Sequence, residues 1–187
     1  DQALDAVAEM YAPAVGTGTV MDYLGQTGLE ALKGAGILST APQKYHSTVE
    51  YSDSPIGQNL QGIAKVLLAD LGTRIFNTQH IGYDTHANQG LYHLKLWTDL
   101  SQAITDFYDD LREHNAADNV LMFVFTEFGR RVRDNGAGTD HGSGGVAFAI
   151  GDAVKGGMYS EYPSLKADDL LEGDLRFAFD YRGAYGT

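Results

Sequence analysis

The chain contains no cysteine among its 187 residues, and this absence excludes disulfide bonds and metal sites built from thiolates. Basic residues are scarce, since 13 Lys and Arg stand against 25 Asp and Glu, and the net charge is -12. Because binding to nucleic acid depends on clustered basic side chains, this charge argues against a nucleic-acid partner. No apolar run approaches the roughly 20 residues that a membrane-spanning helix needs.

The chain starts at Asp1 and shows no signal-peptide pattern, which favours a processed or partial product. Hydrophobic residues make up 43% and charged residues 20%, as in ordinary soluble domains and unlike disordered chains. The length suits one domain with a substantial core. We therefore predict a single, partial α/β domain over residues 1–187, with a helical or irregular lead-in at 1–54 and the core at 55–187.

Helical spacing of apolar residues is the main pattern along the chain. It predicts helices over residues 1–11, 20–38, 55–71 and 90–114. Gly34 and Gly36 are expected to end the second helix, because glycine commonly follows the last helical turn. Ser54 and Pro55 predict the start of the third helix, with Ser54 as the N-cap and Pro55 at the first helical position.

The helix at 90–114 has the clearest pattern, with one apolar stripe and one acidic face. The stripe consists of Leu91, Leu94, Trp97, Leu100, Ile104, Phe107, Tyr108 and Leu111. We expect it to pack on a sheet through Trp97, Leu100, Ile104 and Phe107. The opposite face carries Asp99, Asp106, Asp109, Asp110 and Glu113. We interpret those carboxylates as a solvated surface.

Three segments have the character of strands: TRIFNTQHIG at 73–82, NVLMFVF at 119–125 and GVAFAIG at 145–151. The last two are apolar at consecutive positions, which is typical of parallel strands covered on both sides. With a long helix between the first and second segments, the order predicts an α/β fold. Its sheet would be layered and mostly parallel, with helices on both faces. The fold would be incomplete at both ends, and the open edge of the sheet would pair with a missing segment or another chain.

Metal-capable side chains lie in the loops next to these segments, and in parallel sheets ligands bind beyond the carboxyl ends of strands. Asp84 and His86 come after the first segment, Glu127 after the second, and Asp140 and His141 before the third. Carboxylates and imidazoles suit zinc or manganese. We predict that Asp84, His86 and His141 converge on one divalent ion, with Glu127 as a fourth ligand and Asp140 orienting a ligating imidazole.

Each of these residues also has a simpler interpretation. Asp84 could cap the turn into the following helix, and Asp140 could form an Asx-type turn in its Gly-rich stretch. Glu127 could pair with Arg130. The basic pair Arg130 and Arg131 could hold an anionic substrate group or form surface ion pairs. The remaining histidines, His46, His80, His93 and His114, show no partnering pattern.

Several motifs in fixed order resemble a known family. They are GYDTHANQG, then VLMFVFTEFGRRVRDNGAGTDHG, then FAIGDAVKGGMY and GDLRFAFDYRGAY. Over roughly residues 55–187 they resemble the domain-of-unknown-function 1501 family of the alkaline phosphatase-like, or sulfatase-like, superfamily. The resemblance implies an exported bacterial protein, periplasmic or extracellular, with the parallel-sheet core of metal-dependent phosphatases and sulfatases.

Within that superfamily, Asp84 and His86 resemble an Asp and a His that follow one strand, and His141 resembles a late histidine. Glu127 and Phe128 stand where the superfamily has the Asp and His of a Ser-Asp-His-Gly motif. Phenylalanine cannot bind a second metal. The superfamily's nucleophile segment has no match in this chain, which therefore resembles the C-terminal portion of a catalytic domain.

Two functions of different class follow from this. The first is an exported hydrolase of small phosphate or sulfate esters that uses a divalent metal, zinc in the first instance, with manganese and calcium as alternatives. The second is an exported, non-catalytic structural or carbohydrate-associated protein that keeps the fold. The Asp84, His86 and His141 set favours the hydrolase, and Phe128 favours the non-catalytic protein.

Overall fold

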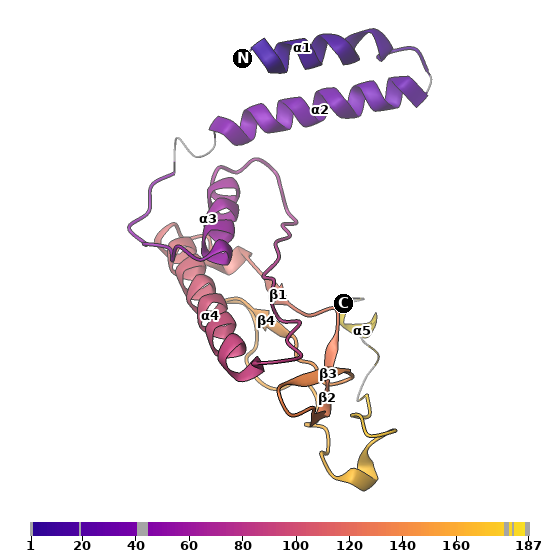
Figure 1. The fold of residues 1–187 in the computed structure, drawn as a ribbon. Helices are drawn as coiled ribbons and strands as arrows, with labels where there is room; N and C mark the ends of the chain where they lie inside the picture. Colours follow the sequence, from indigo (N-terminus) through magenta and orange to yellow (C-terminus); the bar gives the residue numbers. More distant parts are fainter. Residues whose placement is uncertain (1, 19, 41–44, 178–179, 181, 186–187) are drawn as a thin grey trace. The chain divides into compact units, whose positions relative to one another are not determined.

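The structure is a computed structural model that describes residues 2–18, 20–40, 45–177, 180 and 182–185 (Figure 1). Its helices are α1 Gln2–Tyr11, η1 Ala12–Ala14, α2 Val20–Thr40, α3 Pro55–Leu68, α4 Gln89–Glu113, η3 Ala117–Asn119, η4 Ala167–Asp169 and α5 Arg182–Tyr185. Its strands are β1 Met122–Val124, β2 Gly129–Asp134, β3 Thr139–Gly142 and β4 Phe148–Ile150. None of the helices in these described ranges is both long and apolar enough to cross a membrane.

The chain divides into two compact units, one of residues 1–48 with 61–77 and one of 49–60 with 78–187. In the first unit, α1 and α2 form a helical pair in which a Cβ on Gly28 would lie 2.9 Å from the Tyr11 ring. Helix α2 continues to Thr40, so the prediction that Gly34 and Gly36 end it is wrong. Neither glycine has a positive φ, the conformation of a glycine that ends a helix.

Helix α3 begins at Pro55, as its sequence predicts. The Ser54 hydroxyl accepts a hydrogen bond from the Gly57 amide at 3.1 Å, which is the expected N-cap contact. This satisfies an amide that no helical carbonyl can reach.

The core of the second unit lies along the C-terminal half of α4. Leu100, Ala103, Phe107, Tyr108 and Leu111 of this helix are buried, together with Tyr51, Ile56, Leu60 and Ala117 from other segments. The N-terminal half of the apolar stripe is exposed at Leu91 and Leu94, and Trp97, which was expected to pack on a sheet, is 40% exposed. Trp97 instead makes edge contacts with Tyr83 and Phe148.

The acidic face of α4 is also not uniformly solvated. Asp110 is fully buried and Asp106 is nearly so. The Tyr51 hydroxyl donates to Asp110 at 2.8 Å, and the Ser52 amide donates to Asp106 at 3.2 Å. The two carboxylates therefore attach the segment before α3 to α4. Such long-range partners cannot be recognised from a run of acidic residues.

The predicted layered, mostly parallel sheet is contradicted. The structure has two small sheets, and both are antiparallel. Strand β1 pairs with β4, with Phe123 opposite Ala149, while β2 pairs with β3 (Figure 1). Parallel pairing needs a crossover connection, usually a helix, and the chain between β1 and β4 instead contains the β2–β3 hairpin.

The segment 73–82 forms no helix or strand, so that strand prediction is wrong. Ile75 is 89% exposed and Ile81 is 79% exposed, and strand propensity is realised only where neighbouring strands and a packed face accept the side chains. The expected buried strands reduce to the short β1 and β4, where Phe123 and Phe148 keep over a third of their surface exposed.

Candidate metal centre

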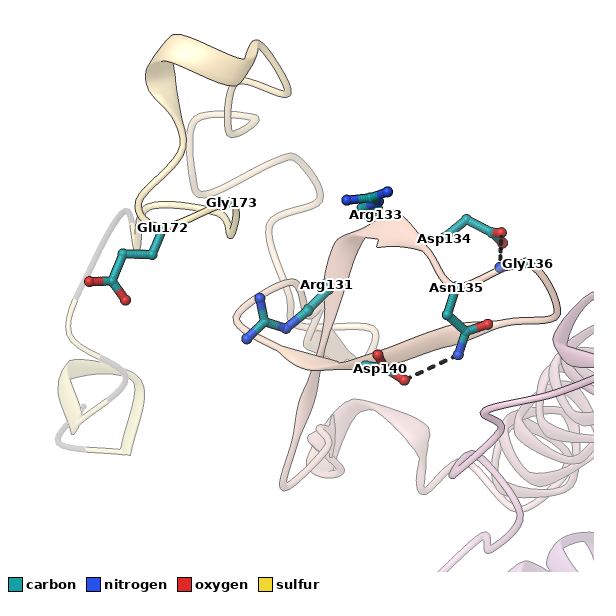
Figure 2. Close-up of a pocket in the computed structure, with 8 residues that line it drawn as sticks. All are labelled: Arg131, Arg133, Asp134, Asn135, Gly136, Asp140, Glu172 and Gly173. Atoms are coloured by element: carbon teal, nitrogen blue, oxygen red, sulfur yellow. Dashed lines mark hydrogen bonds between the residues drawn. The ribbon is translucent and has the colours of Figure 1, made fainter.

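The β2–β3 hairpin forms one side of the candidate centre. Its turn is closed by side chains: the Asp134 carboxylate accepts from the Gly136 amide at 2.6 Å, and Asn135 Oδ1 accepts from Ala137 and Gly138. Asn135 Nδ2 also donates to the Asp140 carboxylate at 3.1 Å, which Figure 2 shows across the hairpin. Asp140 thus lies on β3, and the Asx-type turn belongs to Asp134 and Asn135.

The segment Asp84–His86 forms the other side. Burial alternates along it, with Thr85 buried and Asp84 and His86 exposed on either side. Thr85 Oγ1 lies 2.8 Å from His93 Nε2, which ties the segment to the first turns of α4. The N-cap position of α4 is Asn88, so Asp84 does not cap this helix.

Hairpin and segment lie in close contact at Gly138. A Cβ on Gly138 would lie 2.9 Å from the carbonyl oxygens of both Thr85 and His86, so only glycine fits there. Asn135 Nδ2 donates to the His86 carbonyl at 3.2 Å, and Thr139 Oγ1 donates to the Gln89 side chain at 3.0 Å. These contacts fix β3 against the loop that precedes α4.

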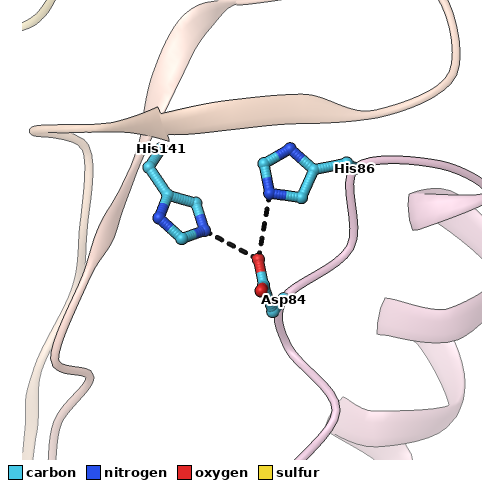
Figure 3. A group of neighbouring side chains, drawn as sticks. All are labelled: Asp84, His86 and His141. Carbon is cyan, nitrogen blue, oxygen red and sulfur yellow. Dashed lines mark hydrogen bonds and ion pairs between the residues drawn. The ribbon is translucent and has the colours of Figure 1, made fainter.

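Three potential ligands meet where these parts join. Figure 3 shows His141 projecting from β3 toward Asp84 and His86 on the loop. Asp84 Oδ1 lies 2.7 Å from His141 Nε2 and 3.1 Å from His86 Nε2. One ligand atom from each side chain lies within 4.8 Å of the other two. All three side chains are about half exposed or more, so solvent reaches the cluster.

Hydrogen bonds with the imidazoles lower the pKa of the neighbouring carboxyl groups. The bond from His141 is the largest cause that lowers the pKa of Asp84, and the bond from His86 is the largest that lowers the pKa of Asp140. His86 Nδ1 lies 3.1 Å from Asp140 Oδ1, so its Nε2 faces Asp84. A carboxylate on the remote nitrogen of an imidazole is the usual way to orient a metal ligand.

Rings stack on His141 as well. The Phe128 ring lies parallel to it, with centroids 4.4 Å apart and an interplanar angle of 8°. The His86 ring also stacks on it at 5.0 Å. Phe128 therefore contacts a candidate ligand directly.

Three further residues that were predicted for the site, Glu127, Arg130 and Arg131, lie outside the group of three ligands. Arg130 lies 3.6 Å from Asp84 and forms no ion pair with Glu127 among the described residues. Glu127 is exposed and lies outside the cluster of three ligands found in that part of the chain. Arg131 is exposed, and with Arg133 and Asp140 it lines an open hollow of about 920 Å³ on the hairpin (Figure 2).

A smaller hollow of about 370 Å³ lies directly beside the loop ligands. Its lining includes Asp84, Thr85 and His86, with Tyr92 and Leu96 of α4. A volume of this size matches the lower range of sites for small molecules. The cluster therefore adjoins space for a small substrate.

The residues present fit a divalent metal. Two imidazoles and one carboxylate form a common zinc donor set, and tetrahedral bonds of about 2.0–2.2 Å place two ligand atoms of one ion roughly 3.3–3.6 Å apart. The observed ligand atoms, all within 4.8 Å, reach that range through small side-chain rotations. Three protein ligands also leave a coordination position open, as catalytic zinc sites do.

Three contacts at this site were not predicted from the sequence: that of Thr85 with His93, that of Gly138 with the Asp84–His86 loop, and the stacking of Phe128 on His141. The Asn135–Gly136 pair signals a hairpin turn and was the available clue to β2 and β3, which bring His141 to Asp84. The pairing of Thr85 with His93 spans eight residues and left no periodic pattern.

Comparison with known families gives one further finding. A family model described as "Protein of unknown function (DUF1501)" matches residues 23–173, which start earlier and end earlier than the resemblance over roughly 55–187. The matched range contains all of the residues of the candidate centre. Searches of curated proteins and of solved structures gave no match. Because the family model covers more than half of the chain, the protein belongs to the DUF1501 family.

Proposed function

We propose that this protein binds one divalent metal ion, zinc in the first instance, through Asp84, His86 and His141, and hydrolyses small phosphate or sulfate esters. The observation that carries the proposal is the convergence of these three side chains from two separate chain segments. Hydrogen bonds alone do not explain an exposed cluster of this composition, because exposed polar groups are equally well satisfied by water.

The surroundings of the cluster support a catalytic role over a purely structural one. A structural zinc site is closed by four protein ligands, whereas the described residues bring three together here. The cluster is open to solvent and adjoins a hollow suited to a small ester. When bound, the ion would supply positive charge for the oxygens of the ester group.

The chain's own groups have limited roles in this proposal. Asp140 orients His86, and the exposed Arg131 is available for an anionic group. Thr85 is buried and its hydroxyl is directed to His93, so it does not serve as the nucleophile. The order of Asp84, His86 and His141 resembles that of phosphatases and sulfatases that act outside the cytoplasm, and this supports an exported enzyme. The antiparallel sheets give that resemblance no support from the fold.

A non-catalytic, exported metal-binding protein is the second candidate. Phe128 favours it, because its ring replaces a histidine with which superfamily enzymes bind a second metal. In this case the ion would hold the Asp84 loop to β3 without acting on a substrate. Both candidates require the metal, and only the first requires hydrolysis.

The test uses protein that has been stripped with a chelator and reloaded with zinc, manganese or calcium. We expect one of these ions to restore hydrolysis of p-nitrophenyl phosphate or p-nitrophenyl sulfate, and His141→Ala to abolish it. His46→Ala, which removes an exposed histidine outside the cluster, is the matched control. Stoichiometric binding without hydrolysis would favour the second candidate. Absence of binding would contradict both.

A further inference from the structure

Arg130 lies on the same face of the β2–β3 hairpin as a candidate ligand. It stands opposite His141 in the antiparallel register, and directly opposite residues project to the same side. Its neighbour Arg131 projects to the other side and is exposed, whereas the Arg130 side chain is only 15% exposed. A guanidinium that is always charged and largely buried needs several acceptors.

Those acceptors belong to both segments that carry the ligands. Arg130 Nη1 donates to the Thr139 carbonyl at 2.6 Å, two residues before His141. Arg130 Nη2 donates to the Tyr83 carbonyl, directly before Asp84, and lies 3.6 Å from the Asp84 carboxylate. One planar group thus bonds to the backbone next to two of the three ligands.

The ring of Phe128 completes this contact. The Arg130 guanidinium lies 5.2 Å from the centroid of Phe128, and the same ring stacks on His141. Gly129 between them permits the close approach of β2 to β3, because a Cβ there would lie 2.5 Å from the Gly142 carbonyl oxygen. The Phe128–Arg130 segment therefore reaches both the backbone and one imidazole of the centre.

We propose that Phe128–Arg130 is the positioning segment of the metal centre, in which Arg130 sets the spacing of the two ligand-bearing segments and Phe128 fixes the ring plane of His141. This inference rests on the metal binding proposed above and does not depend on hydrolysis. It also changes the role of Arg130 from an anion-binding residue to one that acts through the ligands, because its side chain is largely buried and both terminal nitrogens donate to backbone carbonyls. Arg131 remains the arginine open to an anion.

The geometry of the guanidinium explains why arginine is needed at this position. Its fork holds several donors in one rigid plane, so two carbonyls bonded to it are held at a set separation. Lysine keeps the charge and has a single ammonium on a flexible stem, which cannot set that separation. The substitution of lysine for arginine therefore keeps the positive charge and removes only the rigid geometry of the donors.

The experiment is a cobalt(II) titration of the metal-free full chain, followed by the visible absorption band of the bound ion. We expect Arg130→Lys to raise the Kd about tenfold to a hundredfold, the range found for groups that orient metal ligands, and to change the shape of the band. We expect Phe128→Leu to raise the Kd and alter the band as well. Arg112→Lys, the same exchange at an exposed arginine of α4 outside the cluster, should match the wild type in both.

The outcomes separate the two proposals. If the wild type itself binds no cobalt, the proposed function fails. If the wild type binds cobalt and both Arg130→Lys and Phe128→Leu keep its Kd and its band, the positioning role is overturned, even if either variant has a lower melting temperature. Should Arg130→Lys not fold without cobalt, Phe128→Leu decides the matter, because it leaves the two carbonyl bonds of Arg130 in place.

Discussion

The C-terminal half of α4 and the metal centre belong to one compact unit and are held together in opposite ways. Around Leu111 and Phe107, apolar side chains are removed from water. At the centre, the ligands are exposed, and side-chain hydrogen bonds hold the segments that carry them. The difference indicates that the stability of the fold and the affinity for metal reside in different residues and can be changed separately.

The substitution Leu111→Ala should have the largest effect on stability, and it tests whether stability and metal affinity are separate. Leu111 is fully buried, so the substitution removes packed methyl groups and leaves a cavity. We expect the free energy of unfolding to fall by about 2–5 kcal/mol in denaturant titrations. The metal affinity of the folded fraction should stay at the wild-type value.

The matched control is Leu94→Ala, the same substitution on the exposed half of the same helix. It should change stability by no more than about 0.5 kcal/mol. An equal loss in both variants would show that the two halves of α4 do not differ as the structure indicates. Weaker metal binding by folded Leu111→Ala would show that core and site are coupled.

Thr85→Val should have a smaller effect, and it tests the connection between the two regions. The substitution keeps the shape of the side chain and removes the hydrogen bond between Thr85 and His93. We expect a loss of about 1 kcal/mol in thermal or denaturant unfolding, because His93 loses its partner in a half-buried site. Thr85→Ser keeps a hydroxyl and should recover most of that loss. A valine variant as stable as the wild type would mean that this bond does not anchor the loop.

The smallest expected effect is a dependence of the folding stability on pH through His80. Burial is the main cause that lowers the pKa of His80, which lies 3.0 Å from the Tyr83 hydroxyl. The unfolded chain therefore binds a proton at His80 more readily than the folded chain. Its contribution to stability is complete above the unfolded pKa of about 6.5 and is lost as pH falls below that value toward the folded pKa.

This pH dependence is checked by urea unfolding of the metal-free protein at pH values on both sides of 6.5. His80→Gln should show a shallower fall in stability over the acid part of that range than the wild type. Identical slopes for the two proteins would contradict a lowered pKa at His80. The effect is small because the side chain is only half-buried.

Local patterns predicted the main helices and the convergence of three side chains, but not the sheets. The extent of helix α4 and the Ser54–Pro55 start of α3 were predicted correctly, since both depend on neighbours within one or two helical turns. Asp84, His86 and His141 were expected to meet, and the structure brings them together. That they bind metal stays a prediction.

The predictions that were wrong concern features that depend on contacts between residues distant in the chain. Consecutive apolar residues around Phe123 and Phe148 predicted strands, yet the pattern does not encode whether two strands run parallel or antiparallel. Asp110 belongs to the acidic face of α4 in the sequence pattern, and its burial depends on partners that include Tyr51, far away in the chain. His141 was expected near Asp84 for the wrong reason, because an antiparallel hairpin brings it there instead of the edge of a parallel sheet.

The most direct test of the central claim is X-ray diffraction from crystals of the zinc-loaded protein, with anomalous data collected at the zinc absorption edge. The account predicts one strong anomalous peak within about 2.0–2.2 Å of an Asp84 oxygen, His86 Nε2 and His141 Nε2. Zinc bound at other residues, or no peak between these three side chains at saturating zinc, would contradict it.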